Sequence, residues 1–397
     1  MEKIETVKTA VVGCGKISSV YLRNLRDLFT ITEVVAVCDV NRAAAESQAA
    51  KYGIPNVWTL DEIAKAPEIE LVVVLTGPMF NFDVIQKMLF AGKHVYTEKT
   101  LAEDLEHGRE LLKLADERKL YLGASPDTIL GAGIQTARKV LDAGLIGRAS
   151  SAVVSINRNH SLNAEEFRFL QKAKSASFLY DVGIYYVTAL LSLLGPAEAL
   201  CGFTEQTPVH PAEHLFHGLN QPDIRMPGTE LVTGAVKMKN GCCAAIHFNG
   251  ASNNEEWDVL TIFGTEGILH VGSCGGFGGE VRLIRSESGE CIIPHTHGYD
   301  GKPVFPDLDQ NEEAGYEHRG VGAAEMAWAI REGRPCRCSK ELAFHALEVL
   351  QGLEQSAREG KTYTMTSDFT SAPLKSGYLS TMFHGFMRGD AEGSLRN

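Results

Sequence analysis

Long apolar runs, an excess of positive charge and a regular cysteine pattern are all missing from this chain of 397 residues. No apolar run is long enough to cross a bilayer, so the sequence does not predict a membrane partner. The formal net charge is −12 at pH 7, and no basic patch interleaved with aromatic residues is present. We therefore expect no nucleic-acid partner.

The cysteines do not form a disulfide framework, because the nine of them are odd in number and irregular in spacing. Cys14, Cys38 and Cys201 lie in apolar stretches and are expected to be buried thiols. Cys336 and Cys338 form a C-x-C pair that lacks the second pair needed for a zinc site. The first residues, MEKIETVKTAVVGCG, lead directly into a predicted strand without a signal-peptide pattern, so we expect a cytoplasmic protein.

The composition that is present, 44% hydrophobic and 22% charged, is typical of a globular protein, and the length suits two domains. In the first part of the chain predicted strands alternate with predicted helices, which favours a doubly wound parallel sheet. Later β-rich runs alternate in hydrophobicity, which predicts a mainly antiparallel sheet. We expect an α/β fold with a Rossmann domain over residues 1–125, an α/β domain with a large open sheet over 126–365, and an arm or tail over 366–397.

A dinucleotide-binding turn is predicted between the first strand and the first helix, where Gly13, Gly15 and Ser18 occupy its three small-residue positions. The first glycine permits the tight turn, and the second lets the backbone approach a pyrophosphate. The helix N-terminus offers free N–H groups and a positive dipole end. We therefore assign Lys16 and Ile17, at the start of this helix, to the cofactor site as well.

The cofactor preference is predicted from Asp39, which ends the second strand within the sequence range of a ribose contact. A carboxylate there bonds the ribose hydroxyls and repels a 2′-phosphate, which favours NAD over NADP. Arg42 lies nearby and would moderate this preference. The alternative interpretation is a structural turn closed by a capping aspartate.

Glu98 and Lys99, within AGKHVYTEKTLAEDL, lie at the carboxyl end of a predicted parallel strand, the edge at which doubly wound sheets bind ligands. Together with the glycine turn and TGPMFN after the third strand, this stretch resembles the Gfo/Idh/MocA family (glucose–fructose oxidoreductase, inositol dehydrogenase and rhizopine catabolism). The resemblance extends to about residue 363. It implies a Rossmann domain followed by a substrate-binding and oligomerisation domain, an NAD cofactor, and Lys99 as a catalytic or substrate-orienting residue.

The chain departs from the family pattern at three places near this edge. Thr100 replaces the usual proline after Glu-Lys, the usual Thr-Pro turn contains an inserted glycine, and Asn81 stands where many members have histidine. The match at Lys99 is intact. The residues of this edge that we assign to cofactor binding are Thr76, Gly77, Pro78, Asn81, Glu98 and Lys99.

A third motif, SASFLYDVGIYY, resembles the Asp-x-Gly-x-His segment of the family: Asp181 and Gly183 match, and Tyr185 holds the histidine position. A tyrosine there is similar to the glucose–fructose oxidoreductase and dihydrodiol dehydrogenase branches. Oxidising a secondary alcohol needs a base for the hydroxyl proton while hydride leaves the carbon. An unperturbed tyrosine has a pKa near ~10 and is a poor base at neutral pH, whereas a nearby ammonium lowers that pKa.

We therefore predict that Tyr185 exchanges the proton, that Lys99 lowers its pKa and holds the substrate oxygen, and that Asp181 orients the sugar or holds Lys99. The reversed assignment, with Lys99 as the base, stays open. The structural alternative is that Tyr185 and Tyr186 only pack the helix N-terminus.

Three further residues are expected at the substrate crevice. Arg158 and His160 follow the first strand of the second domain, and Asp127 lies at the junction of the two domains. We predict that they bind polar groups of the substrate. A solvated strand end is the alternative for Arg158 and His160.

The spacing of His210, His214 and His217 would align three imidazoles on one helical face, and a zinc site is one interpretation. Pro211 and the lack of a nearby acidic triad element argue against it. We therefore predict no metal and favour a sugar-binding loop.

As a whole the sequence predicts an NAD(H)-dependent oxidoreductase that converts a secondary hydroxyl of a sugar, glycoside or cyclitol to the ketone. Some relatives retain their NAD, and long loops at 203–228 and 294–318 would suit a bulky substrate. Two alternatives stay open: a glycoside-cleaving enzyme in which oxidation starts an elimination, and a non-catalytic NAD-binding regulatory protein. The open sheet and the relatives imply a homodimer or homotetramer.

Overall fold

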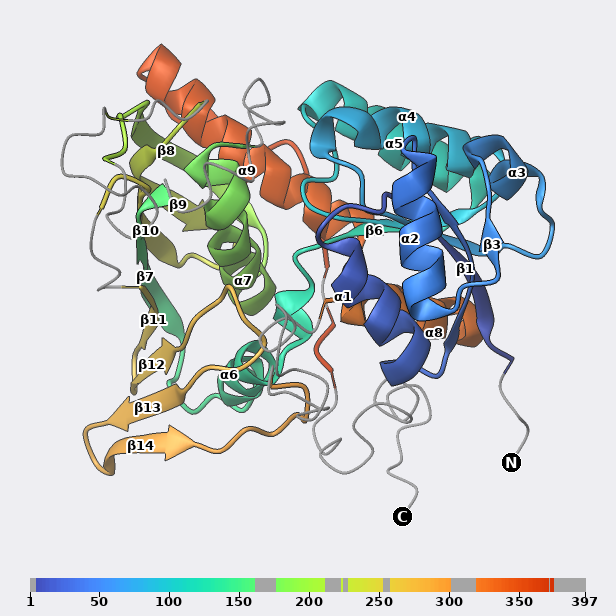
Figure 1. The fold of residues 1–397 in the computed structure, drawn as a ribbon. Helices are drawn as coiled ribbons and strands as arrows, with labels where there is room; N and C mark the ends of the chain where they lie inside the picture. The colour runs from blue at the N-terminus through green and yellow to red at the C-terminus, as the bar shows by residue number, and fades with distance from the viewer. Residues whose placement is uncertain are drawn as a thin grey trace.

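The computed structural model describes residues 5–160, 176–210, 223, 228–252, 258–300, 319–370 and 372–374. The described part forms two sheets, each with helices packed on it (Figure 1). None of its helices combines the length and the apolar character needed to span a bilayer.

The first sheet has six parallel strands in the order β3-β2-β1-β4-β5-β6, which is the Rossmann order. Its central strand β4 is fully buried, as expected for a strand covered by helices on both faces. The predicted doubly wound domain is confirmed. The strands are β1 (Val7–Val12), β2 (Thr32–Cys38), β3 (Asn56–Val57), β4 (Leu71–Val74), β5 (His94–Thr97) and β6 (Leu122–Ala124), and the helices are α1 (Ser18–Arg23), α2 (Arg42–Tyr52), α3 (Leu60–Lys65), α4 (Pro78–Phe90) and α5 (Leu105–Arg118).

The second sheet has nine strands in the order β14-β13-β12-β11-β7-β10-β9-β8-β15. Its pairings are antiparallel except for the parallel pair β7–β10, so the predicted large, mainly antiparallel sheet is confirmed. The strands are β7 (Ala149–Asn157), β8 (Ala197–Glu205), β9 (Leu231–Met238), β10 (Cys243–Asn249), β11 (Val259–Gly264), β12 (Ile268–Val271), β13 (Val281–Arg285), β14 (Gly289–Ile293) and β15 (Tyr363–Thr364).

Helices α6 (Ala132–Asp142), α7 (Ile184–Leu194) and α9 (Lys340–Glu359) lie on one face of the second sheet, the face turned toward the first domain (Figure 1). The largely apolar sequence of α7 agrees with this position, because ten of its eleven residues are buried between the sheet and α9.

Strand β8 was missed in the sequence, where its end was assigned to a long loop beginning at residue 203. Its burial alternates, with Leu200 inside and Cys201 and Phe203 exposed. The prediction that Cys201 is a buried thiol is therefore wrong, because strand alternation turns its side chain away from the helices. Cys14 and Cys38 are buried as predicted.

Helix α8 (Val321–Glu332) returns the chain to the first sheet, although in sequence it follows the second. The Arg331 guanidinium donates to both carboxylate oxygens of Glu70, each at 2.7 Å. The hydroxyl of Tyr121 donates to the carbonyl of Arg334 at 2.9 Å. The chain thus passes from the second sheet back to the first domain at α8, and then returns to the second sheet with α9 and β15.

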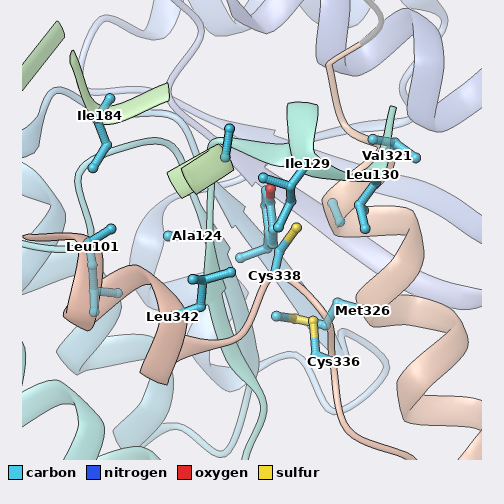
Figure 2. Packing of buried hydrophobic residues seen from close by; sticks show 14 of the residues in the cluster. Leu101, Ala124, Ile129, Leu130, Ile184, Val321, Met326, Cys336, Cys338 and Leu342 are labelled. Atoms are coloured by element: carbon cyan, nitrogen blue, oxygen red, sulfur yellow. The ribbon is translucent and has the colours of Figure 1, made fainter. Parts of the chain in front are cut away.

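A buried apolar cluster fills the junction between the domains (Figure 2). Leu101, just after β5, lies near Ile184 at the start of α7 and Leu342 in α9, and all three are almost inaccessible. Close packing of this kind fixes relative position, since interiors are as dense as organic crystals. The cluster therefore sets the end of β5 against the start of α7, where the predicted catalytic residues lie.

The chain after β15 is tied to α9 by one carboxylate. Glu348 is fully buried and accepts hydrogen bonds from the main-chain N–H groups of Thr366 (2.8 Å) and Ser367 (2.9 Å) and from the Tyr363 hydroxyl (2.9 Å). Further along, the Leu374 N–H donates to the side chain of Gln135 at 2.8 Å. The first part of the predicted arm, as far as residue 374, is thus held on the fold, and the remainder lies outside the described residues.

Candidate active site

The glycine turn has the geometry that a pyrophosphate needs. Gly13 has φ +104°, and a Cβ there would lie 2.7 Å from the main chain just after β4, so no larger residue fits. Gly15 is exposed, with nothing within 4 Å of its hypothetical Cβ, and Lys16 beside it is exposed too. Ser18 closes the turn by donating to the Gly15 carbonyl at 2.6 Å, and α1 starts after Ile17 without a side-chain cap. The turn therefore presents open backbone at a helix N-terminus.

Asp39 lies beside this turn, at the carboxyl edge of the sheet. Its two carboxylate oxygens accept from the N–H groups of Cys14 and Asn41, each at 2.7 Å, and its side chain stays partly exposed. Arg42 is exposed and pairs with Glu46 at 2.9 Å in the next turn of α2. Each oxygen of Asp39 keeps a second lone pair for a ribose hydroxyl.

The turn after β4 is braced by a side-chain pair. Thr76 and Asn81 are hydrogen-bonded at 2.6 Å, and Asn81 is fully buried beneath the turn. Gly77 caps α4 and Pro78 is its first residue, a position where proline is well tolerated because its missing N–H would have no partner. The buried Asn81 thus stabilises the turn through its hydrogen bond to Thr76. Thr76, Gly77 and Pro78 themselves are partly exposed.

Glu98 accepts a hydrogen bond from Tyr21, a residue that the sequence analysis did not identify. The hydroxyl of Tyr21, in α1, donates to Glu98 at 2.6 Å and lies 3.1 Å from the Ser125 hydroxyl. The other carboxylate oxygen of Glu98 accepts from the main-chain N–H of Lys99 at 3.1 Å. The glycine turn and the Glu-Lys motif are thereby linked through Tyr21.

Lys99 and Asp181 meet across the domain junction. The Lys99 ammonium donates to the main-chain oxygen of Asp181 at 3.0 Å and to its carboxylate, and the two side chains are only 18% and 12% exposed. Burial opposes the charge of Lys99, but the Asp181 carboxylate outweighs it and raises the pKa of Lys99 to about 12. Burial likewise opposes the charge of Asp181, yet Lys99 and His160 hold its pKa well below its usual range. The pair is therefore ionised at neutral pH.

Tyr185 lies beneath two cations. The Lys99 ammonium is 5.7 Å from the centre of its ring, and the Arg319 guanidinium is 4.9 Å from it. Burial raises the pKa of Tyr185 to about 12, although Arg319 and Lys99 both act to lower it. The expected effect of Lys99 is present but smaller than the effect of burial. No sequence signal pointed to Arg319, which follows a stretch without pattern.

Asp127 is fully buried and accepts from the N–H groups of Gly320 (3.0 Å) and Gly322 (3.1 Å) at the start of α8. Its other oxygen lies 3.7 Å from the Arg319 guanidinium. Burial raises the pKa of Asp127 to about 6, against the opposing effect of Arg319. In this structure Asp127 therefore fixes Arg319 and the start of α8.

Arg158 and His160 have separate acidic partners. Arg158 pairs with Asp258 at 2.9 Å. The fully buried imidazole of His160 places Nδ1 2.7 Å from Glu230 and Nε2 3.6 Å from the second carboxylate oxygen of Asp181. Lys99 and His160 thus face different carboxylate oxygens of Asp181.

Among the three histidines considered for a metal, His210 lies 3.0 Å from the carboxylate of Asp223, and both side chains are exposed. His214 and His217 lie outside the described residues. Within the described ranges no group of three or more His, Cys, Asp or Glu side chains has the arrangement of a metal site.

Comparison with known protein families agrees with this geometry. Residues 7–125 match the family described as "Oxidoreductase family, NAD-binding Rossmann fold", and residues 134–270 match the "GFO/IDH/MocA C-terminal domain". The chain belongs to the Gfo/Idh/MocA oxidoreductase family. The expected family and its dinucleotide-binding Rossmann domain are therefore confirmed.

Relatives of this family member cover different shares of the chain. It is 27% identical over 372 residues to scyllo-inositol 2-dehydrogenase (NADP(+)) IolW of Bacillus subtilis, covering 91% of this chain and 96% of that protein. Its 26% identity to the uncharacterized oxidoreductase C115.03 of Schizosaccharomyces pombe covers 52% of this chain and 57% of that protein. It is 31% identical to inositol 2-dehydrogenase of Rhizobium meliloti over 38% of this chain and 45% of that protein. For the last two the chain thus matches about half of the relative's length.

Solved structures share the fold of this Gfo/Idh/MocA protein. Levoglucosan dehydrogenase in complex with NADH and levoglucosan has a TM-score of 0.75 at 18% identity, covering 91% of this chain and all of that one (100%). The WlbA dehydrogenase of Bordetella pertussis, in complex with NADH and UDP-GlcNAcA, has a TM-score of 0.69 at 19% identity, covering 92% of this chain and 99% of that one. At these identities the likeness establishes the fold.

Proposed function

We propose that this protein is an NAD(H)-dependent oxidoreductase that oxidises a secondary hydroxyl of a sugar, glycoside or cyclitol to the ketone, with Tyr185 and Lys99 as its acid–base pair. The observation that carries the proposal is the contact between Lys99 of the Rossmann domain and Asp181 of the second domain, with Tyr185 beside them. These groups stand at the carboxyl edge of the parallel sheet, where doubly wound folds bind their ligands.

The substrate class is supported by the relatives. Scyllo-inositol and inositol dehydrogenases act on cyclitols by name, and the structural neighbour levoglucosan dehydrogenase is named for a sugar derivative. The ionisable groups around the Lys99–Asp181 contact face opposite partners within the protein: Lys99 faces Asp181, His160 faces Glu230, and Arg319 lies close to Asp127. Such compensation suits a neutral polyol.

The glycine turn and Asp39 fit a nicotinamide dinucleotide, which would supply the hydride acceptor at this edge. The partly exposed carboxylate of Asp39 favours NAD over NADP by repelling a 2′-phosphate. A dimer or tetramer as the working form is part of the same proposal. Native mass spectrometry of the purified protein tests both the number of subunits and whether NAD stays bound to the protein.

In the reaction the Lys99 ammonium donates a hydrogen bond to the substrate oxygen and stabilises negative charge that develops on it. Asp181 holds that ammonium in place. Tyr185 exchanges the proton: with a pKa of about 12 its phenol is protonated at neutral pH and delivers a proton when the ketone is reduced, whereas oxidation of the alcohol needs its phenolate, the minor form at that pH. Lys99 also has a pKa of about 12, and its ammonium is bound to Asp181, so we assign it the role of hydrogen-bond donor and Tyr185 the role of proton carrier.

The test is a screen of sugars, glycosides and cyclitols for NADH absorbance, followed by the Tyr185→Phe variant with the best substrate. We expect Tyr185→Phe to bind NADH with unchanged affinity, measured by fluorescence, and to lose about 10²- to 10⁴-fold in kcat, the usual contribution of a positioned proton donor. Tyr186→Phe is the matched control, since its hydroxyl contacts Asp258 at 3.3 Å instead of the pocket.

Undiminished turnover of Tyr185→Phe would remove this residue from the mechanism. A protein that binds NADH but oxidises no polyol would favour the regulatory alternative. Release of a free aglycone from a glycoside, without a keto-sugar product, would favour the glycoside-cleaving alternative.

A further inference from the structure

A buried carboxylate that the proposed mechanism does not use lies directly behind Asp181. It belongs to Glu230, the residue just before β9, which is completely inaccessible to solvent. One of its oxygens accepts from the main-chain N–H of Phe178 at 3.0 Å, and the other lies 2.7 Å from Nδ1 of His160. Burying a carboxylate is costly unless it is paired and hydrogen-bonded, and here both oxygens have partners.

The sheet topology brings Glu230 and His160 together. Strand β10 is parallel to β7 and antiparallel to β9, so the ends of β7 and β10 and the start of β9 share one edge, with Asn249 opposite both Asn157 and Leu231. Two backbone hydrogen bonds continue this edge, from His160 N–H to the Gly250 carbonyl and from Gly250 N–H to the Glu230 carbonyl, each at 2.8 Å.

Gly250 leaves room for the carboxylate. A Cβ at this position would lie 2.5 Å from a carboxylate oxygen of Glu230 and 2.8 Å from the side chain of Phe178. The ring of Phe178 in turn packs edge-on against the His160 imidazole, with centroids 5.4 Å apart. The backbone and the packing are thus arranged around the Glu230–His160 pair.

Each ring nitrogen of His160 faces a carboxylate oxygen, from Glu230 at 2.7 Å and from Asp181 at 3.6 Å. A neutral imidazole carries one N–H and would leave a lone pair facing one of these carboxylates, whereas the doubly protonated ring offers an N–H to both. Asp181 then holds Lys99, so negative and positive groups alternate in the order Glu230, His160, Asp181, Lys99.

We propose that Glu230 and His160 are positioning residues for the active-site lysine: Glu230 holds a doubly protonated His160, and this cation fixes the Asp181 carboxylate that holds Lys99. The role assigned to Lys99 rests on the proposed function, while the protonation and placement of His160 do not. His160 thereby acts through Asp181 and, being fully buried, does not touch the substrate.

Within the described residues, charged groups reach His160 from three places: Glu230 before β9, Asp181 ahead of α7 and, beyond it, Lys99 after β5. Burial lowers the pKa of His160, but the neighbouring carboxylates of Asp181 and Glu230 outweigh burial and raise it to about 9. The cation is therefore expected to persist through neutral pH.

The first experiment reads the imidazole directly, in the ligand-free full-length protein labelled with ¹⁵N-histidine. The His160→Gln variant identifies the signal of this residue among the thirteen histidines. We expect both ring nitrogens of His160 to be protonated at pH 7.5 in the wild type and the ring to be neutral at that pH in Glu230→Gln. A neutral His160 in the wild type overturns the proposal, whether or not the protein oxidises any polyol.

The second experiment uses turnover. We expect His160→Gln and Glu230→Gln to lower kcat about 10-fold or more and to shift its pH profile, while the affinity for NADH, which is bound by the other domain, stays unchanged. Glu348→Gln is the matched control, because Glu348 is an equally buried glutamate that holds the chain after β15 and lies outside the pocket. Loss of thermal stability in all three variants with an unchanged pH profile would show that Glu230 and His160 only support the fold, and would overturn the proposal.

Discussion

At the scale of single residues, burial and charge compete at Tyr185. Two cations face its ring, Arg319 at 4.9 Å and Lys99 at 5.7 Å, and both favour the phenolate. Burial favours the neutral phenol more strongly and leaves the pKa at about 12. Each cation is also drawn toward a carboxylate, Asp127 or Asp181, which weakens its effect on the phenol.

This balance predicts how the reaction depends on pH. For a phenol with a pKa near 12, the fraction present as phenolate rises about tenfold with each unit of increasing pH up to that value. The kcat/KM for oxidation should therefore rise between about pH 7 and pH 10. Reduction of the ketone should not rise over the same range, because the protonated phenol is already the dominant form. Initial rates in both directions measure this, and a flat oxidation profile would contradict the role of Tyr185.

We assign the preference for NAD over NADP to one carboxylate, that of Asp39. Asp39→Asn removes the charge that repels a 2′-phosphate, and its single amide oxygen can accept from only one of the N–H groups of Cys14 and Asn41, so thermal stability is measured alongside the kinetics. We expect the ratio of kcat/KM with NAD to that with NADP to fall about 10-fold, equivalent to ~1.4 kcal/mol. Asp61→Asn, an exposed carboxylate paired with Lys87, serves as control. An unchanged ratio would limit Asp39 to closing the turn.

At the scale of elements, α9 contacts the second sheet, α7 and the segment that follows β15. It packs on β8 and α7, and Glu348 within it binds the segment that follows β15. The carboxylate accepts from Thr366, Ser367 and Tyr363, all charge-assisted contacts in a buried place. These bonds also keep the pKa of Glu348 below its usual range, although burial acts to raise it.

Glu348→Gln should therefore destabilise the protein by about 2–3 kcal/mol, because an amide cannot accept all of these hydrogen bonds and its NH₂ group would face donors. Thermal unfolding measures the loss. Since the folded-state pKa is depressed, the contribution is present above the ordinary pKa of a glutamate and is lost as pH falls through the lower folded value. The difference between variant and wild type should therefore shrink in acid, and a difference that persists there would contradict this account.

At the scale of the whole molecule, one face of the second sheet has no helix on it in the described part of the chain (Figure 1). The strand register aligns exposed side chains across four strands of this face: Cys201 opposite Ala235, Ala235 opposite Ala245, and Ala245 opposite Val153. This row of exposed small apolar side chains on an uncovered sheet face is a candidate interface.

We expect a second copy of the chain to cover this face in a homodimer or homotetramer, since closed symmetric assemblies are the commonest solution for such surfaces. Ala245→Glu, at the centre of the row, should shift the mass measured by light scattering toward the monomer. Phe90→Glu, on the Rossmann domain, also replaces an exposed apolar side chain with a charge and should leave the mass unchanged. A monomeric wild type would contradict the expectation.

The sequence by itself determined the fold class and the glycine turn with Asp39, because each depends on local spacing within one strand–turn–helix unit. Its resemblance to the family motifs predicted Lys99, Asp181 and Tyr185 as site residues, and the structure brings these three together. It missed β8, since a nine-residue run with a central glycine gave a weak alternation signal. Only the tertiary structure decided the charges of the site. Arg319, Glu230 and Tyr21 come from distant segments with no motif of their own, and they meet Tyr185, His160 and Glu98 because strand pairing and the packed junction bring those segments together. The pKa of a buried group depends on such neighbours and on its distance from water, and neither quantity is encoded in local sequence.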